Sequence, residues 1–156
     1  MHQSDFNFWH HWYPIAPIED LKRDRPIPIT LLGQKLVIWK PGHYPTFRVF
    51  VDQCPHRLAP LSEGRIDPDN GQLMCSYHGW QFDEAGTCKR IPQAENPSIL
   101  ETHPQNFCVT SLPTQEANGL LWVWPDAASA AIAQQHPLPL SPQLDGSPEV
   151  VYSSMV

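Results

Sequence analysis

Short apolar runs separated by turn residues make up most of the chain. Each run is rich in β-branched or aromatic residues, which favour strands, and is bounded by glycine, proline or other turn residues. The predicted strands are 29–32, 35–40, 47–52, 73–76, 80–83, 87–91, 107–111 and 119–124. The first two flank Gly33 and form a predicted hairpin. Because short strands with regular turn signals are typical of sandwiches and barrels, we predict an all-β fold, a small antiparallel sandwich or barrel.

The first part of the chain is unusually aromatic. Residues 6–13 carry five aromatic side chains in eight positions. This pattern is too apolar for a free tail and too irregular for a helix, so we expect the segment to pack onto the domain. His10 and His11 lie among these rings without a cysteine or carboxylate pattern, and we expect them to be packed or half-exposed side chains, not metal ligands.

The last part of the chain has a different amino-acid composition. An alanine-rich stretch at 127–133 favours about two helical turns. Four prolines between residues 137 and 148 then enforce an extended path, and residues 149–156 have the pattern of a strand. We therefore predict one domain over 1–125, and over 126–156 a proline-rich linker with the first strand towards a catalytic domain outside this sequence.

Composition and charge narrow the class of protein. The chain has 156 residues, enough for one domain with a buried core, and its 18 prolines disfavour long helices. The net charge is −6 and no basic run exceeds a Lys-Arg pair, which argues against a nucleic-acid partner. No apolar run approaches the roughly 18 residues of a membrane span and no signal pattern is present, so we expect a soluble protein that is not exported.

Two loops each contain one cysteine and one histidine. The first reads CPHR at residues 54–57 and the second reads CSYHGW at residues 75–80, and each follows a predicted strand. Two cysteines and two histidines are sufficient for a tetrahedral zinc ion. They also suit a two-iron, two-sulfide cluster in which one iron takes both cysteines and the other takes both histidines. Mixed Cys/His loops favour the cluster, because structural zinc sites more often place two cysteines in one motif and two histidines in the other.

These motifs resemble the Rieske [2Fe-2S] signature in its oxygenase form, and the resemblance covers about residues 30–125. It implies a Rieske-type fold with two cluster-binding loops at one end. The implied ligands of the [2Fe-2S] cluster are Cys54, His56, Cys75 and His78. The residues expected next to the cluster are Arg57, Gly79 and Trp80. Arg57 either steadies its loop or is simply an exposed arginine.

Longer stretches narrow the resemblance to one branch. Residues 12–15, 31–37, 54–64 and 76–80 are similar to the branch that holds pheophorbide a oxygenase, chlorophyllide a oxygenase and the Tic55-type proteins. That branch belongs to oxygenic phototrophs. The resemblance therefore implies a cyanobacterial protein, cytoplasmic or associated with thylakoids, or a plastid protein without its transit peptide. It also implies a chlorophyll-type tetrapyrrole as the substrate.

By the same resemblance, the chain is the electron-transfer part of an oxygenase. Single electrons would come from a ferredoxin or a reductase and pass to a mononuclear Fe(II) in a catalytic domain of the same or a neighbouring subunit, within a trimer. The two-histidine, one-carboxylate motif for that iron is not in this sequence, so we assign no catalytic residue. Two alternatives remain open, a freestanding Rieske ferredoxin and a structural Cys2His2 zinc module.

Two further expectations concern the potential and the remaining cysteines. High-potential Rieske proteins have hydroxyl donors to the cluster sulfurs where this chain has Trp80 and Phe82, so we expect a reduction potential towards the low end of the roughly −150 to +300 mV range. Cys88 and Cys108 lie outside the two loops. In a chain that we expect to be intracellular, a buried apolar side chain or a solvent-facing thiol is favoured over a mutual disulfide.

Overall fold

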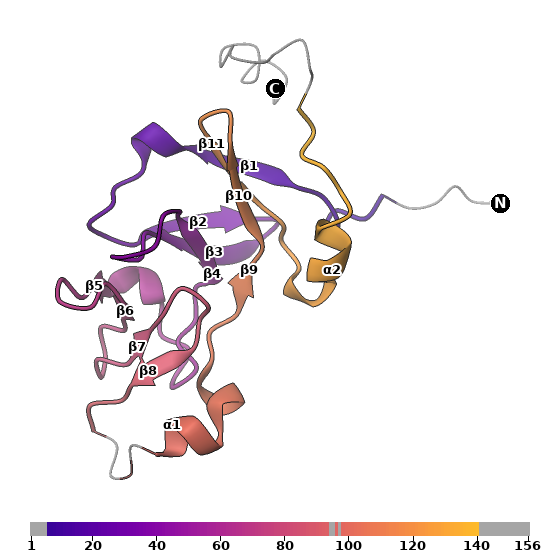
Figure 1. Ribbon diagram of the computed structural model, residues 1–156. Helices are drawn as coiled ribbons and strands as arrows, with labels where there is room; N and C mark the ends of the chain where they lie inside the picture. Colours follow the sequence, from indigo (N-terminus) through magenta and orange to yellow (C-terminus); the bar gives the residue numbers. More distant parts are fainter. Residues whose placement is uncertain (1–5, 94–95, 97, 141–156) are drawn as a thin grey trace. The chain divides into compact units, whose positions relative to one another are not determined.

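The computed structural model describes residues 6–93, 96 and 98–140. The chain divides into two compact units, one of residues 22–111 and one that joins residues 6–21 to residues 112–140. Both units are built from antiparallel strands (Figure 1). Helices in the described ranges have at most four residues, and none is long and apolar enough to cross a membrane.

The first sheet of the larger unit is a meander with one added strand. It contains β2 (Ile27–Leu31), β3 (Gln34–Trp39), β4 (Arg48–Val51) and β9 (Ser111–Leu112), in that order. The turn between β2 and β3 has positive φ at Leu32 (53°) and Gly33 (79°), as tight two-residue hairpin turns require. The hairpin predicted around Gly33 is therefore confirmed. The last four residues of β3 are buried, because this strand is central in the sheet.

The second sheet is a meander of four very short strands. They are β5 (Arg65–Ile66), β6 (Leu73–Met74), β7 (Gln81–Phe82) and β8 (Cys88–Arg90). The strands predicted at 73–76, 80–83 and 87–91 are confirmed but shortened. The residues between β6 and β7 are not in the sheet, because they form a loop closed by its own backbone hydrogen bonds.

Three short helices complete the larger unit, and one of them corrects a prediction. They are η2 (Leu61–Glu63), α1 (Ile99–Thr102) and η3 (Pro104–Phe107). The strand predicted at 107–111 is wrong for most of its length, because Phe107 ends η3 and only Ser111 lies in a strand. Proline at the start of η3 favours a helical turn, and this outweighs the β-propensity of the residues that follow.

The smaller unit is a three-stranded sheet. Its order is β1 (Tyr13–Pro17), β11 (Leu120–Val123) and β10 (Thr114–Ala117), with the short helix η1 (Ile18–Asp20) after β1. The strand predicted at 119–124 is confirmed as β11, whereas β1 and β10 were not predicted. The expected packing of the aromatic segment holds from Trp12 onward, which is 8% exposed. It is wrong for Phe6 and Phe8, which are 59% and 57% exposed.

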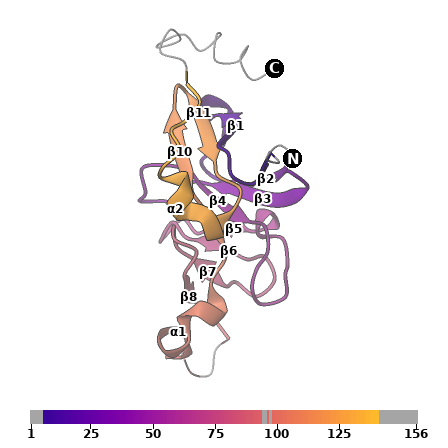
Figure 2. The same ribbon diagram turned by 90° about the vertical axis from the view of Figure 1, so that its right-hand side faces the viewer.

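The alanine-rich stretch is helical, as predicted. It forms η4 (Ala127–Ser129) and α2 (Ala130–Ala133), and Ala133 is buried in a cluster with Trp12, Trp122 and Trp124. Figure 2 shows α2 next to the hairpin of β10 and β11. The strand predicted at 149–156 lies outside the described residues.

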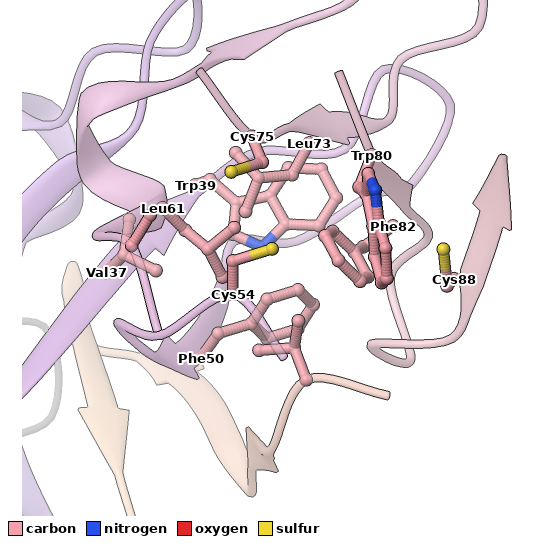
Figure 3. Packing of buried hydrophobic residues seen from close by; sticks show 12 residues of the cluster. Val37, Trp39, Phe50, Cys54, Leu61, Leu73, Cys75, Trp80, Phe82 and Cys88 are labelled. Atoms are coloured by element: carbon pink, nitrogen blue, oxygen red, sulfur yellow. The ribbon is translucent and has the colours of Figure 1, made fainter. Parts of the chain in front are cut away.

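The core of the larger unit draws on both of its sheets (Figure 3). Trp39 and Phe50 meet edge to face with ring centroids 5.3 Å apart, and Phe82 is fully buried beside them. Cys54 and Cys75 belong to the same buried cluster, so both Cys/His loops begin inside the core. The antiparallel all-β fold is as predicted, with three sheets that stay open instead of closing into a barrel.

Candidate metal centre

The two Cys/His loops have the same backbone hydrogen-bond pattern. In the first, the N–H of Cys54 donates to the carbonyl of Ala59 (2.8 Å) and the N–H of Leu58 donates to the carbonyl of Cys54 (2.7 Å). In the second, the N–H of Cys75 donates to the carbonyl of Trp80 (2.8 Å) and the N–H of Gly79 donates to the carbonyl of Cys75 (3.2 Å). Each loop is thus closed on its own cysteine and spans six residues from start to end.

The fourth residue after each cysteine has a left-handed backbone. Gly79 has a φ of 72°, which glycine adopts at little cost. Leu58 has a φ of 58° at the equivalent position of the first loop, where a side chain costs about 1–2 kcal/mol. The leucine is 64% exposed, so packing does not repay this strain. The shared loop geometry therefore holds even where the local sequence opposes it.

The four metal-capable side chains are sorted into two pairs. Cys54 and Cys75 are 1% and 3% exposed, and Cys75 is close enough to Cys54 to raise the pKa of its thiol. His56 and His78 are exposed, and their ring centroids lie 4.8 Å apart at an interplanar angle of 71°. The thiol pair is therefore on the inner side of the loops and the imidazole pair on the outer side.

This sorting distinguishes the two kinds of centre that the donors allow. A tetrahedral zinc ion needs four donors around one point. Within the described part of the chain, no three His, Cys, Asp or Glu side chains gather around one point closely enough for a single ion. Two adjacent metal atoms, one facing the thiols and one facing the imidazoles, fit the arrangement better. The donor set thus suits a two-iron cluster with unlike ligand pairs.

The titration of these groups follows from where they lie. Burial raises the pKa of the Cys54 thiol to about 12, with the neighbouring Cys75 acting in the same direction and the backbone N–H of His56 opposing it. The pKa of His56 is lowered by partial desolvation, and then by the nearby His78 and Arg57. A lowered pKa favours the neutral imidazole, which is the form that binds metal.

Two of the three residues expected beside the centre make specific contributions. The indole of Trp80 is stacked on the His56 ring, with centroids 4.6 Å apart and an interplanar angle of 11°. Gly79 provides the left-handed turn of the second loop. Arg57 is exposed, and its charge acts on His56 through space.

Two buried polar groups fix the segments around the loops, and the sequence patterns did not reveal either one. Asp52, directly after β4, accepts hydrogen bonds from the backbone N–H (2.7 Å) and the hydroxyl (2.6 Å) of Ser62. Gln81, 1% exposed, accepts from the side-chain amide of Asn70 (2.6 Å) and donates to a carboxylate oxygen of Asp67 (2.9 Å). Their only sequence signal is a polar residue next to an apolar run.

The other two cysteines and the N-terminal histidines are outside the two Cys/His loops in the sequence. Cys88 is buried and Cys108 is exposed, and the four described cysteines form no disulfide. His10 stacks on Trp124 and lies 3.5 Å from the Asp126 carboxylate. His11 stacks on Phe6. Both histidines are partly buried against aromatic rings, as expected, although His10 also has a carboxylate partner that the sequence pattern did not indicate.

Comparisons with known proteins bear on this geometry. A family model described as the Rieske [2Fe-2S] domain matches residues 11–113. The chloroplast pheophorbide a oxygenase of Arabidopsis thaliana is 48% identical over 125 residues, which cover 79% of this chain and 23% of that protein. The chloroplast flavonoid 8-hydroxylase 2 of Ocimum basilicum is 43% identical over 126 residues, covering 80% and 24%. The chain thus spans about a quarter of the length of these relatives.

The solved structures agree with the sequence matches. A crystal structure of dicamba monooxygenase bound to 3,6-dichlorosalicylic acid superposes with a TM-score of 0.71 and 32% identity, over 84% of this chain and 35% of that one. The fold class and the resemblance indicated by the sequence motifs are both confirmed.

Proposed function

Because the chain belongs to the Rieske [2Fe-2S] domain family, we propose that it is the electron-transfer domain of a ring-type oxygenase. Residues 1–125 are the domain in this proposal. Residues 126–156 are the linker and first strand towards a catalytic domain. The observation that carries the proposal is the sorting of four donors into a buried thiol pair and an exposed imidazole pair.

In this proposal the thiolates of Cys54 and Cys75 hold one iron and the imidazoles of His56 and His78 hold the other. When bound, such a cluster takes up and releases one electron. Burial of the thiols keeps that end of the site away from water. Exposure of both imidazoles leaves their ring edges at the surface, where a partner can approach them. The histidines are therefore the side through which electrons enter or leave.

The proposed donor is a ferredoxin or a reductase, and the proposed acceptor is a mononuclear Fe(II) in a catalytic domain of the same or a neighbouring subunit of a trimer. Support comes from the relatives, which are oxygenases of which the chain spans only 23–24%. A related dicamba monooxygenase has also been solved with non-haem iron. A freestanding ferredoxin has no comparable support.

The proposed substrate of the whole enzyme is a chlorophyll-type tetrapyrrole, in an oxygenic phototroph. The 48% identity to pheophorbide a oxygenase supports this substrate, and the chloroplast location in the names of the relatives supports the setting. The proposed place is the cytoplasm of a cyanobacterium, at or near the thylakoid.

Iron and acid-labile sulfide content tests the cluster directly. We expect the purified full chain to contain two of each, as a [2Fe-2S] cluster requires. Cys75→Ser should lose both, whereas Cys88→Ser, the matched change of a buried cysteine not assigned to the cluster, should retain both. A colourless protein with zinc and no acid-labile sulfide would contradict the assignment.

Stopped-flow reduction tests the electron-transfer role separately. The cluster-loaded chain is mixed with a reduced plant-type ferredoxin, and bleaching of the cluster absorbance is followed. Rapid bleaching is expected. A loaded cluster that dithionite reduces but neither ferredoxin nor a flavin reductase reduces would contradict the role in electron transfer while leaving the cluster assignment intact.

A further inference from the structure

The two exposed histidines are held differently by their surroundings. The His56 ring lies nearly parallel to the indole of Trp80, at an interplanar angle of 11° and a centroid distance of 4.6 Å. The aromatic neighbours of His78 are His56 and Tyr77, at interplanar angles of 71° and 80°. The Tyr77 ring is also farther away, at 6.5 Å. The face of the His56 ring is therefore covered by a parallel ring, and both aromatic contacts of His78 are edge-on.

Trp80 is itself fixed in place. It is 8% exposed and belongs to the buried cluster of the larger unit. Its ring contacts Phe107 at a centroid distance of 5.7 Å. Its backbone carbonyl accepts the hydrogen bond that closes the second loop on Cys75. Trp80 thus connects the two loops, because its backbone belongs to the second loop and its ring lies on the histidine of the first.

A stacked ring constrains its partner in one particular way. The lone pair of an imidazole nitrogen lies in the ring plane, so holding the plane also holds the direction in which the nitrogen donates. Aromatic pairs prefer defined geometries and contribute beyond the area they bury. A tryptophan fixed by the core can therefore hold the His56 plane, whereas the Tyr77 ring, 61% exposed and distant, gives His78 no equivalent support.

We propose that Trp80 is a positioning residue that fixes the imidazole plane of His56 towards the cluster, and that His78 is the less constrained histidine of the pair. This inference rests on the proposed function, in which both histidines bind the same iron. Removing the indole should leave the ligands in place but let His56 adopt a spread of orientations. The spread should be visible in the spectrum of the reduced cluster and in the rate at which the cluster is lost.

The test compares Trp80→Leu and Tyr77→Leu in the cluster-loaded full chain. The EPR spectrum of the reduced cluster should broaden in Trp80→Leu, because more orientations of His56 give a wider spread of g values. Loss of iron to a chelator should be about two- to tenfold faster, the range expected when one aromatic pair is removed. Tyr77→Leu should match the wild type in both measurements.

A core control separates positioning from simple destabilisation. Leu73→Ala removes a fully buried side chain of the same cluster, and we expect it to lower stability without broadening the EPR spectrum. Should Trp80→Leu fail to fold, Trp80→Met keeps the site filled with a long apolar side chain that has no ring. Broadening of its spectrum then supports the proposal, and an unchanged spectrum overturns it.

The outcomes distinguish this inference from the function on which it rests. A wild-type chain that forms no cluster overturns both. A wild-type cluster whose EPR spectrum is the same in Trp80→Leu overturns only the positioning role. Equal broadening in Trp80→Leu and Leu73→Ala also overturns it, since the effect would then follow from loss of core packing.

Discussion

A Cβ atom placed on Gly64 would lie 1.9 Å from the carbonyl oxygen of Met74. Gly64 follows η2, which comes after the first Cys/His loop, and Met74 directly precedes Cys75 of the second. The φ of Gly64 is −85°, which other residues adopt readily, so the close contact and not the backbone conformation requires glycine. The contact brings the end of the first loop region against the start of the second.

Gly64→Ala should therefore disturb both loops at once. Because the obstacle is backbone and cannot rotate away, we expect a loss of about 3 kcal/mol in the free energy of unfolding, the upper end for overpacking. The cluster content of the purified protein should fall with it. Urea denaturation of the cluster-free chain measures the first effect. Gly33→Asn is the control, because Gly33 has open space around it and asparagine tolerates positive φ. A Gly64→Ala chain as stable as this control would contradict the argument.

At Leu58, glycine should raise the free energy of unfolding relative to alanine. Its backbone is left-handed and its side chain is exposed, so Leu58→Gly should give a chain about 1 kcal/mol more stable than Leu58→Ala. The comparison with alanine cancels the loss of the side chain, and urea denaturation of both variants measures it. Ala85, which is exposed and has no positive φ, is the control, and Ala85→Gly should give no gain. A Leu58→Gly chain no more stable than Leu58→Ala would show that the loop carries no strain there.

The buried Cys88 thiol should make the unfolding free energy of the cluster-free chain depend on pH. Burial raises the pKa of its thiol from 9.0 to about 11. The unfolded chain therefore releases this proton at lower pH than the folded chain. The stabilisation is fully present below about pH 9 and is lost as pH rises towards 11.

Cys88→Ala should remove this contribution. The difference in unfolding free energy between wild type and Cys88→Ala should shrink between about pH 8 and about pH 10.5, as measured by urea denaturation. Leu73→Ala is the control, because it removes a fully buried side chain that carries no titratable proton, so its difference from wild type should not change with pH. A pH-independent difference for Cys88→Ala would contradict ionisation of a buried thiol.

The reduction potential should lie towards the low end of the roughly −150 to +300 mV Rieske range. The reason is that Trp80 and Phe82 bring no hydroxyl group to the cluster sulfurs, and Phe82 is fully buried among apolar side chains. His78→Cys should retain two irons and lower the potential further, because a thiolate adds negative charge where a neutral imidazole stood. Protein-film voltammetry measures both. A wild-type potential near the upper end would contradict the role assigned to the missing hydroxyls.

Local patterns were sufficient for much of the fold. Alternating apolar runs around Gly33 predicted the β2–β3 hairpin, and two short motifs predicted the four residues that the structure sorts into pairs. The strand predicted from Phe107 was wrong because its apolar, β-favouring residues do not reveal the helical turn η3. That turn begins at a proline and includes Phe107. β1 was missed because its two prolines obscured a strand whose pairing with β11 is more than 100 residues away in the chain.

The supports of the candidate centre were beyond the reach of local patterns. Asp52 and Ser62 are ten residues apart, and neither residue type indicates that Asp52 accepts two hydrogen bonds from Ser62. The stack between Trp80 and His56 joins two separate loops. The left-handed backbone of Leu58 goes against its own preference and follows from closure of the loop on Cys54. Each of these depends on contacts that exist only once the chain has folded.

The central claim is that the two cysteines bind one iron of the cluster and the two histidines bind the other. Pulsed EPR of the reduced cluster, in protein labelled with ¹⁵N only at histidine, tests it most directly. We predict two strongly coupled histidine nitrogens, with one lost in His78→Cys. Both should be retained in His103→Gln, which changes an exposed histidine outside the two loops. A reduced cluster without histidine nitrogen coupling, or a chain without any such signal, would contradict the account.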